Sequence, residues 1–189
     1  MQKHAVFFDR DNTLNYDPGY IGDPNQIKLF PGVIEGIKKL RNQYKFKIIV
    51  VSNQSGITRN ILSESDVIAV NEKINEILRE HETEIDDFFY CPYHPDFDPP
   101  ELTKCRKPSP YMIYKAAEKY NLELEKCYMA GDSVTDIECA VNAGIKSVLL
   151  NYQKDSKLIE LLSREGLNPD FVAESFEEAC EYIIGDYKE

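Results

Sequence analysis

Short apolar runs restrict the fold of this chain more than any other feature of its sequence. Residues 47–51 (KIIVV) are β-branched and almost wholly apolar, as expected of a central strand in a parallel sheet. Residues 5–8 (AVFF) and 147–150 (SVLL) are further apolar runs of strand length. Strands are also predicted at residues 87–90 and 127–130. These runs together predict a sheet whose central strands are buried.

Segments with helical periodicity separate these runs. Pro31 opens a segment with apolar residues at helical spacing, and Ser63 with Asp66 forms a capping box before another helix. Further helices are predicted at residues 111–120, before Gly144 and after a cap at Ser175. Strands that alternate with helices form right-handed βαβ units. We therefore predict one α/β domain over residues 1–189, with a doubly wound parallel sheet flanked by helices.

Composition and charge argue against several classes of partner. The net charge of −11 opposes nucleic acid or an anionic membrane as the main partner. No apolar run approaches the roughly 20 residues of a membrane span, and the first stretch, MQKHAVFF, is too short for a signal peptide. The five cysteines are odd in number and not densely spaced, which favours a reduced protein over a disulfide scaffold. We expect a cytoplasmic monomer with no nucleic-acid or membrane partner.

Polar residues follow the predicted strands at the point where each strand ends. Asp9 and Asp11 follow the first strand, Ser52 follows the second, and Asp132 follows the strand at 127–130. Lys107 belongs to an irregular, proline-rich stretch. In doubly wound sheets the site lies at the carboxyl ends of the strands. Each motif alone is common in turns, but all of them together at strand ends indicate one site.

Two carboxylates as close together in the sequence as those of Asp9 and Asp11 repel each other, and something must compensate for this repulsion. At about 4 Å they repel by about 4 kcal/mol at an effective dielectric constant of roughly 20. A hard divalent cation such as Mg²⁺, with Asp9 and Asp132 as oxygen ligands, removes this repulsion. A phosphate dianion can then approach beside the cation and Lys107. A carboxylate next to such a phosphate can form an aspartyl-phosphate, and a second carboxylate can transfer the protons.

The order of these motifs resembles that of a known family. The series D-R-D-x-T, S-N-Q-S-G, R-K-P and G-D-S-x-x-D is similar to the haloacid dehalogenase superfamily of phosphatases, which has a Rossmann-like fold. More narrowly, DRDNTLN…DPGYI, VVSNQSGI and CRKPSP resemble the D-glycero-D-manno-heptose 1,7-bisphosphate phosphatases and the related histidinol-phosphate phosphatases. The resemblance covers roughly residues 6–150. Asn12 departs from the usual glycine, although asparagine also tolerates a left-handed backbone.

The resemblance implies a role for each motif residue. Asp9 would be the nucleophile and Asp11 the general acid/base. Mg²⁺ would be bound by Asp9, Asp132 and the backbone carbonyl of Asp11, while Asp136 would position the site without binding the metal. Ser52 and Lys107 would hold the transferring phosphoryl group. Beyond the resemblance, our further candidates for substrate binding are Asn53, Arg106, Gly19 and Tyr20.

No segment near the motifs is long enough for a cap domain. Only residues 16–30 separate the first motif from the next helix, so we expect a capless, open site. Specificity must then come from loops, chiefly residues 17–20 and 91–109. Arg106, with its forked geometry, and Arg59 are candidates to bind a second anionic group. A bisphosphate fits this arrangement better than histidinol phosphate.

Relatives in this family often order the second loop with zinc, through Cys-x-His and Cys-x-Cys pairs. This chain keeps Cys91 and Cys105, but Tyr93 and Thr103 occupy two ligand positions, and His94 comes one residue late. A structural zinc site normally has four ligands, and only Cys91, His94 and Cys105 remain. We therefore expect a proline-stiffened loop without metal, with Zn²⁺ as the less favoured alternative.

Functions of other classes are also compatible with parts of this pattern. A signalling receiver domain stores phosphate on an aspartate in a doubly wound fold, but receivers lack an acid/base two residues after the nucleophile. A non-catalytic binding module would not need all four motifs. We therefore predict an Mg²⁺-dependent phosphomonoesterase that acts on a small phosphosugar. The favoured substrate is D-glycero-D-manno-heptose 1,7-bisphosphate, from which the enzyme would remove the C7 phosphate. Histidinol phosphate is the alternative substrate.

Overall fold

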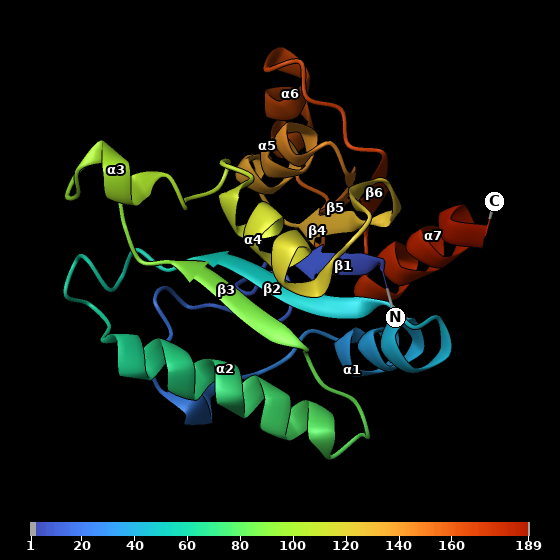
Figure 1. Ribbon diagram of the computed structural model, residues 1–189, viewed down its shortest axis with the longest axis horizontal. Coiled ribbons are helices and arrows are strands. Elements are labelled where there is room, and N and C mark those ends of the chain that lie inside the picture. Colours follow the sequence, from blue (N-terminus) through green and yellow to red (C-terminus); the bar gives the residue numbers. More distant parts are fainter. Residues whose placement is uncertain (1–2, 189) are drawn as a thin grey trace.

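The computed structural model describes residues 3–188 and shows one twisted sheet with helices on both sides (Figure 1). The six strands are all parallel and lie in the order β3-β2-β1-β4-β5-β6. Their bounds are Ala5–Phe8 (β1), Lys47–Asn53 (β2), Asp87–Cys91 (β3), Tyr128–Gly131 (β4), Lys146–Leu150 (β5) and Phe171–Ala173 (β6). This sheet confirms the predicted doubly wound parallel fold.

The helices connect successive strands across the two faces of the sheet. The longer ones are α1 (Val33–Lys38), α2 (Glu64–Arg79), α4 (Tyr111–Tyr120), α5 (Val134–Ala143), α6 (Ser156–Arg164) and α7 (Phe176–Lys188). Shorter turns are η1 (Pro24–Gln26), the π-helical η2 (Lys39–Gln43) that continues α1, α3 (Pro100–Thr103) and η3 (Leu124–Lys126). Among the described residues, no helix is long and apolar enough to cross a bilayer.

Capping residues begin several of these helices, as their sequences predicted. The Ser63 hydroxyl accepts from the Asp66 N–H before α2, and the Asp66 carboxylate accepts from the Ser63 N–H. Ser175 accepts in the same way from the Glu178 N–H before α7. Such a cap satisfies N–H groups that the first turn of a helix leaves free.

Two apolar layers hold the helices on the sheet. Alternate residues of β1 point to opposite faces, so that Val6 and Phe8 join one layer while Ala5 and Phe7 join the other. The first layer includes apolar residues of α1, α2 and α7, and the second includes those of α4 and α5. Both faces of the central strands are covered, which explains their uninterrupted apolar sequences.

Most predicted elements lie at their expected positions, with ends shifted by a residue or two. Helix α1 begins at Val33 after a left-handed Gly32, two residues later than the predicted start at Pro31. Helix α6 and strand β6 were not predicted. Strand β6 has only three residues at the edge of the sheet, too few to show a period of two.

The topology determines where a site can form. Strand order runs outward from β1 through β2 to β3 on one side, and from β4 to β6 on the other. The carboxyl ends of β1 and β4 therefore flank the switch point of the sheet, where doubly wound folds bind their ligands. In the described chain, no domain is inserted over this edge: residues 9–32 contain η1 alone, and residues 92–110 contain only α3. Figure 1 shows α3 and its loops extending beyond the end of β3.

Candidate active site

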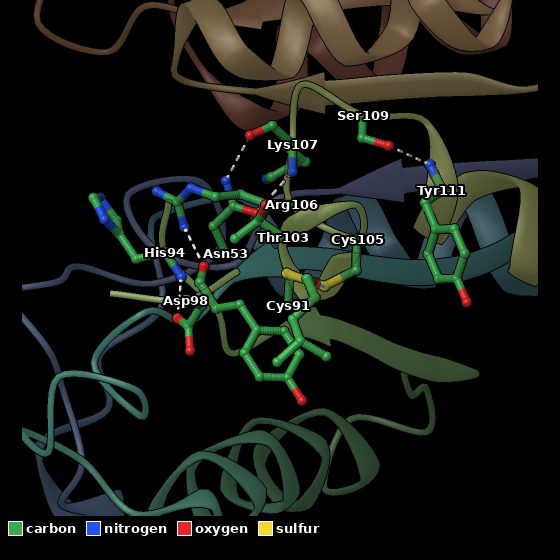
Figure 2. Close-up of a disulfide and its surroundings, with 12 residues drawn as sticks. Asn53, Cys91, His94, Asp98, Thr103, Cys105, Arg106, Lys107, Ser109 and Tyr111 are labelled. Carbon is green, nitrogen blue, oxygen red and sulfur yellow. Dashed lines mark hydrogen bonds between the residues drawn. A yellow bond between two sulfur atoms is a disulfide. The ribbon is translucent and has the colours of Figure 1, made fainter. Parts of the chain in front are cut away.

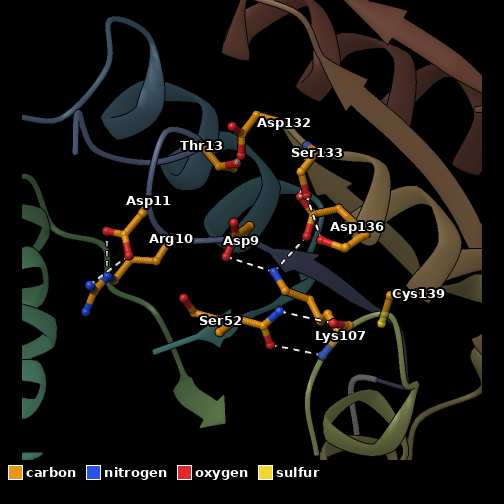
Figure 3. Close-up of polar contacts among 12 residues, drawn as sticks. Asp9, Arg10, Asp11, Thr13, Ser52, Lys107, Asp132, Ser133, Asp136 and Cys139 are labelled. Carbon is orange, nitrogen blue, oxygen red and sulfur yellow. Dashed lines mark hydrogen bonds and ion pairs between the residues drawn. The ribbon is translucent and has the colours of Figure 1, made fainter. Parts of the chain in front are cut away.

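Asp9 lies at the centre of the site, directly after β1. Its backbone N–H donates to the carbonyl of Ala130 in β4, which fixes the two strand ends to each other (3.0 Å). Its carboxylate Oδ1 forms an ion pair with Lys107 Nζ at 2.8 Å (Figure 3). Apart from this ion pair, the buried Oδ1 has no hydrogen-bond partner among residues 3–188. Burial raises the pKa of Asp9 to about 6, Lys107 acts in the opposite direction, and Asp136 adds to the increase.

Lys107 lies on the side of Asp9 that is opposite Asp11 (Figure 3). Its side chain is buried, and Nζ lies 2.7 Å from Oδ1 of Asp136 as well as beside Asp9. Burial alone would lower the pKa of Lys107, but the Asp136 and Asp9 carboxylates outweigh it and raise that pKa. The lysine therefore stays protonated. A fixed positive charge here can hold an incoming phosphate beside Asp9.

Asn53 holds the backbone of Lys107 in place. Its amide oxygen accepts from the Lys107 N–H at 2.9 Å, and its amide nitrogen donates to the Lys107 carbonyl at 3.1 Å. Sequence analysis predicted a substrate contact for Asn53, and here both ends of its amide position the lysine. Ser52, one residue earlier in β2, is also buried, and its hydroxyl accepts from Gln54 Nε2 at 2.8 Å.

Asp132 and Asp136 come from the end of β4 and the start of α5. One oxygen of Asp132 accepts from the Thr13 hydroxyl at 3.0 Å. Asp136 is fully buried and accepts from the N–H and hydroxyl of Ser133 at 3.1 and 2.7 Å. A Cβ at Gly131 would lie 2.4 Å from the Asp136 carboxylate. The carboxylate can therefore occupy this position only because residue 131 is glycine.

These acids form a site suited to a hard cation. Asp9, Asp132 and Asp136 each offer an oxygen, and these atoms all lie within 4.8 Å of one another. Burial, with the nearby Asp9 charge, raises the pKa of Asp132 to about 7. Lys107 and Ser133 both engage Asp136, whereas Asp9 Oδ1 has Lys107 as its one partner among the described residues, and Asp132 accepts only from Thr13 there. Asp9 and Asp132 therefore have the freer oxygens for a divalent cation such as Mg²⁺.

Asp11 is held away from Lys107. Its carboxylate accepts from Arg10 at 3.0 and 2.8 Å, from Gln54 at 2.7 Å and from Asn15 at 3.2 Å. Figure 3 shows Asp11 and Arg10 together on one side of Asp9, with Lys107 and Asp136 on the other. Burial would raise the pKa of Asp11, but Arg10 and the amide donors lower it overall. The structure therefore holds Asp11 as a carboxylate, the form in which it can accept a proton.

Arg10 is the site residue that sequence analysis did not assign. Its guanidinium is almost completely buried, and it donates to Asn71 of α2 at 3.0 Å and to Gln54 at 3.1 Å, besides binding Asp11. A buried arginine is stable only when its donors find acceptors. An arginine between two functional aspartates was the only signal in the sequence, because its partner Asn71 lies 61 residues away.

Aromatic and basic side chains gather at the predicted specificity loops. Tyr20 follows Gly19 in a tight loop, and both residues have positive φ. Arg59 donates to the Tyr20 hydroxyl, and its guanidinium lies 5.2 Å from the centre of that ring. Arg106 is half-buried and donates to the Tyr93 carbonyl at 3.4 Å. Burial lowers the pKa of Arg106, and the neighbouring Tyr20 acts against that change.

The cysteines of the long loop differ from expectation. We expected reduced thiols, but Cys91 and Cys105 are joined in a disulfide (Figure 2). Their sulfurs are bonded to each other, so the candidate zinc set of Cys91, His94 and Cys105 lacks two free thiolates in this structure. His94 Nδ1 accepts from the Asp96 N–H at 3.2 Å. The remaining cysteines are buried as predicted, namely Cys127, Cys139 and Cys180.

A cavity of about 480 Å³ opens beside Asp132. Tyr16, Phe30 and Tyr152 form one wall, with ring centres 3.8 Å apart between the first two and 4.3 Å between the last two. Asn12 also lines the cavity and has φ of 58°, the left-handed conformation expected where relatives have glycine. The acidic edge of the sheet is therefore open to a small molecule.

Comparison with known proteins identifies relatives over nearly the whole chain. Residues 104–179 match the HAD-hydrolase-like family, and residues 1–84 match the family described as mitochondrial PGP phosphatase. The D-glycero-D-manno-heptose-1,7-bisphosphate 7-phosphatase of Chlorobaculum tepidum is 34% identical over 191 residues, covering 96% of this chain and 94% of the relative. The D-glycero-β-D-manno-heptose-1,7-bisphosphate 7-phosphatase of Escherichia coli K12 is 33% identical over 149 residues, 77% of this chain and 78% of the relative.

Solved structures show the same fold. The D,D-heptose 1,7-bisphosphate phosphatase of B. bronchiseptica, complexed with magnesium and phosphate, is 26% identical, with a TM-score of 0.82 and coverage of 98% of this chain and 99% of that one. A putative HAD-like phosphatase of Mesorhizobium loti is 29% identical, with a TM-score of 0.78 and coverage of 98% and 84%.

Proposed function

The chain belongs to the haloacid dehalogenase (HAD)-like hydrolases and is a phosphatase, and we propose that it removes the 7-phosphate of D-glycero-D-manno-heptose 1,7-bisphosphate. The observation that carries this proposal is the placement of Lys107 and the carboxylates of Asp132 and Asp136 around Asp9, with Arg106 directly before Lys107 in the chain. The names of the relatives support the choice of sugar.

Asp9 is the nucleophile in this proposal. Its carboxylate attacks the phosphorus of the 7-phosphate, and the bond to the sugar oxygen breaks as an aspartyl-phosphate forms. Lys107 binds the transferring phosphoryl group, and Ser52 lies at the neighbouring strand end to donate to it. Mg²⁺, held by Asp9, Asp132 and the backbone carbonyl of Asp11, would neutralise charge on the phosphate oxygens.

Asp11 transfers protons in both halves of the reaction. As an acid it donates to the leaving oxygen of the sugar, and as a base it then takes a proton from the water that hydrolyses the aspartyl-phosphate. The acid form requires its carboxyl to leave Arg10, which stabilises the carboxylate. Arg10 keeps its bonds to Asn71 and Gln54 during such a movement. The guanidinium of Arg10 is therefore still hydrogen-bonded when the Asp11 carboxyl moves away.

The second phosphate of the substrate is bound by arginine. Arg106 directly precedes Lys107, and Arg59 stacks on Tyr20 in the facing loop. These cations matter because the chain as a whole carries a charge of −11, which repels a bisphosphate. Arginine is also suited to phosphate because its fork can form two hydrogen bonds at once.

A kinetic comparison of two substrates tests this proposal. We expect a higher kcat/KM for heptose 1,7-bisphosphate than for histidinol phosphate, whose non-reacting end is a cation. Arg106→Ala should lower kcat/KM for the bisphosphate by about 1.5–3 kcal/mol, the value of a charged hydrogen bond. Lys104→Ala is the matched control, because Lys104 is exposed on the same loop. Asp9→Asn serves as the inactive control.

The outcome distinguishes substrate from mechanism. If histidinol phosphate is the better substrate, the heptose assignment is wrong while the phosphatase activity stands. If Arg106→Ala and Lys104→Ala have equal effects, Arg106 does not bind the second phosphate.

A further inference from the structure

The disulfide lies at the base of a loop that carries substrate-binding residues. Cys91 is the last residue of β3 and is fully buried, while Cys105 directly precedes Arg106 and Lys107. The bond therefore joins the two ends of residues 92–104, which we call the tethered loop. Figure 2 shows the sulfur pair between the end of β3 and the segment that leads to Lys107.

Lys107 has an anchor that does not depend on the disulfide. Asn53 holds both the N–H and the carbonyl of Lys107, and Asp9 and Asp136 hold its Nζ. Asn53 itself belongs to β2 and is paired with β3 in the sheet. Opening the disulfide therefore leaves the lysine and its contacts in place.

Arg106 differs, because its side chain and its N–H bond to the tethered loop itself. Its side chain donates to the carbonyl of Tyr93 at 3.4 Å, and its N–H donates to the carbonyl of Thr103 at 2.9 Å. Both acceptors are residues of the tethered loop. Thr58, in the loop that follows β2, donates its N–H to the Pro92 carbonyl at 3.4 Å and its hydroxyl to Asp98 at 2.9 Å, and Tyr93 packs against the second apolar layer. The orientation of the Arg106 side chain therefore depends on the tethered loop, whose two ends the disulfide joins.

We propose that the Cys91–Cys105 disulfide is a redox-sensitive tether that sets the affinity of the site for a second anionic group. With the bond closed, the tethered loop holds Arg106 at the mouth of the site. Reduction frees the loop, so that Arg106 must be ordered again each time substrate binds, and KM rises. The chemical step at Asp9 is unaffected, since Lys107 keeps its own anchors. The role of Arg106 in this inference rests on the proposed function.

The switch requires a dithiol reductant. Its first thiolate attacks Cys105, the more exposed of the two sulfurs, forming a mixed disulfide and releasing the thiolate of Cys91. Its second thiolate then displaces the Cys105 thiolate. The reductant gives up two electrons and becomes a disulfide, and two protons convert the released thiolates to thiols.

A thiol count tests the covalent state directly. Protein purified without reductant and then denatured should show three reactive thiols, from Cys127, Cys139 and Cys180, and five after treatment with dithiothreitol. Five thiols in the untreated protein would overturn the proposal.

Kinetics test the consequence for substrate binding. Oxidised and dithiothreitol-reduced protein are compared with Mg²⁺ as the only metal, so that no soft metal binds the freed thiolates. We expect KM for heptose 1,7-bisphosphate to rise roughly tenfold on reduction, a fraction of what a charged hydrogen bond contributes, with kcat nearly unchanged. KM for p-nitrophenyl phosphate, which has no second anionic group, should not change.

Variants show whether this disulfide is responsible. The double variant Cys91→Ser with Cys105→Ser should have the high KM of reduced protein and not respond to dithiothreitol. Cys180→Ala, which removes a buried cysteine far along the chain in α7, should respond like the parent.

The possible failures are distinguishable. An equal KM for the bisphosphate in both redox forms overturns the tether and leaves the proposed function intact. A fall in kcat for both substrates overturns the claim that Lys107 is anchored independently. If neither form prefers the bisphosphate to histidinol phosphate, the proposed function is wrong and the affinity role of the tether falls with it.

Discussion

Replacement of Asp136 by asparagine separates positioning of Lys107 from binding of metal. Asp136 is fully buried, and its carboxylate accepts from Lys107 at 2.7 Å and from Ser133 through two further bonds. Asparagine has the same shape but only one accepting oxygen. Its NH₂ group would face either the Lys107 ammonium or the Ser133 donors, and a donor facing a donor leaves both unsatisfied.

The expected loss of stability follows from these contacts. Removing one partner of a buried ion pair costs about 3–5 kcal/mol in free energy of unfolding. Lys107 keeps Asp9 as a partner, and repulsion between Asp136 and Asp9 disappears, so the lower end applies. We expect a loss of about 3 kcal/mol, equivalent to a decrease in Tm of roughly 6–12 °C for a chain of this size.

Denaturant unfolding and magnesium titration of the same variant provide the assay. Unfolding is measured at saturating Mg²⁺, which reduces repulsion among the remaining acids, and Asp132→Asn is the matched comparison. We expect Asp132→Asn to weaken Mg²⁺ binding more than Asp136→Asn does, because Asp132 has the freer oxygen. A stability loss below about 1 kcal/mol for Asp136→Asn, within the range of an ordinary surface substitution, would refute the buried-pair argument. Equal losses of Mg²⁺ affinity in the two variants would refute the claim that Asp132 has the freer oxygen for the metal.

Other predictions concern the acid/base and the metal. Asp11→Asn should slow turnover by ~10²–10⁴. Formation of the aspartyl-phosphate from aryl phosphates should be slowed less than from sugar phosphates, because aryl leaving groups need no proton. Rapid-quench measurement of aspartyl-phosphate formation from both kinds of substrate tests this difference. EDTA should abolish activity, and added Mg²⁺ should restore it, which phosphate-release assays will show. The pKa values of Asp9, about 6, and Asp132, about 7, are raised in the metal-free fold. The folded chain therefore holds protons at a pH where the unfolded chain has already released them. The stability of the metal-free fold should therefore fall as pH rises from about 3.8, the ordinary carboxyl value, to about 7 in thermal unfolding, and Mg²⁺ should reduce that fall.

The grouping of the candidate site residues could be predicted from the sequence because topology brings them together. Asp9 and Asp132 each follow an apolar run, and parallel strands place all such exits at one edge of the sheet. The local pattern around each motif was therefore sufficient, and no side-chain contact had to be known. The caps at Ser63 and Ser175 were equally visible, since both partners of each cap lie within three residues of each other.

Contacts between distant residues were not predictable in the same way. The amide of Asn53 holds a backbone 54 residues later, and Arg10 binds Asn71 across 61 residues. Apolar periodicity records which face of an element is buried, but not which polar side chain meets it there. The pairing of Cys91 with Cys105 has the same origin, because the loop between them brings the two sulfurs together only in the folded chain.

Mg²⁺ and phosphate should bind to this site with strong positive coupling. The centre holds three carboxylates, Asp9, Asp132 and Asp136, against one ammonium, Lys107, so its formal charge with all acids ionised is −3 + 1 = −2. A phosphate dianion is repelled by that charge, whereas a divalent cation cancels it, so metal binding should precede phosphate binding.

Thermodynamic linkage makes this coupling testable from either side. If Mg²⁺ tightens phosphate binding by some factor, phosphate must tighten Mg²⁺ binding by the same factor. Calorimetric titration of inorganic phosphate with and without Mg²⁺, and of Mg²⁺ with and without phosphate, measures both factors. We expect each to be at least about tenfold, the lower part of the range for coupled sites. Phosphate binding that is equally tight without Mg²⁺ would mean that Lys107 and the arginines alone overcome the acidic cluster, contrary to the charge balance described above.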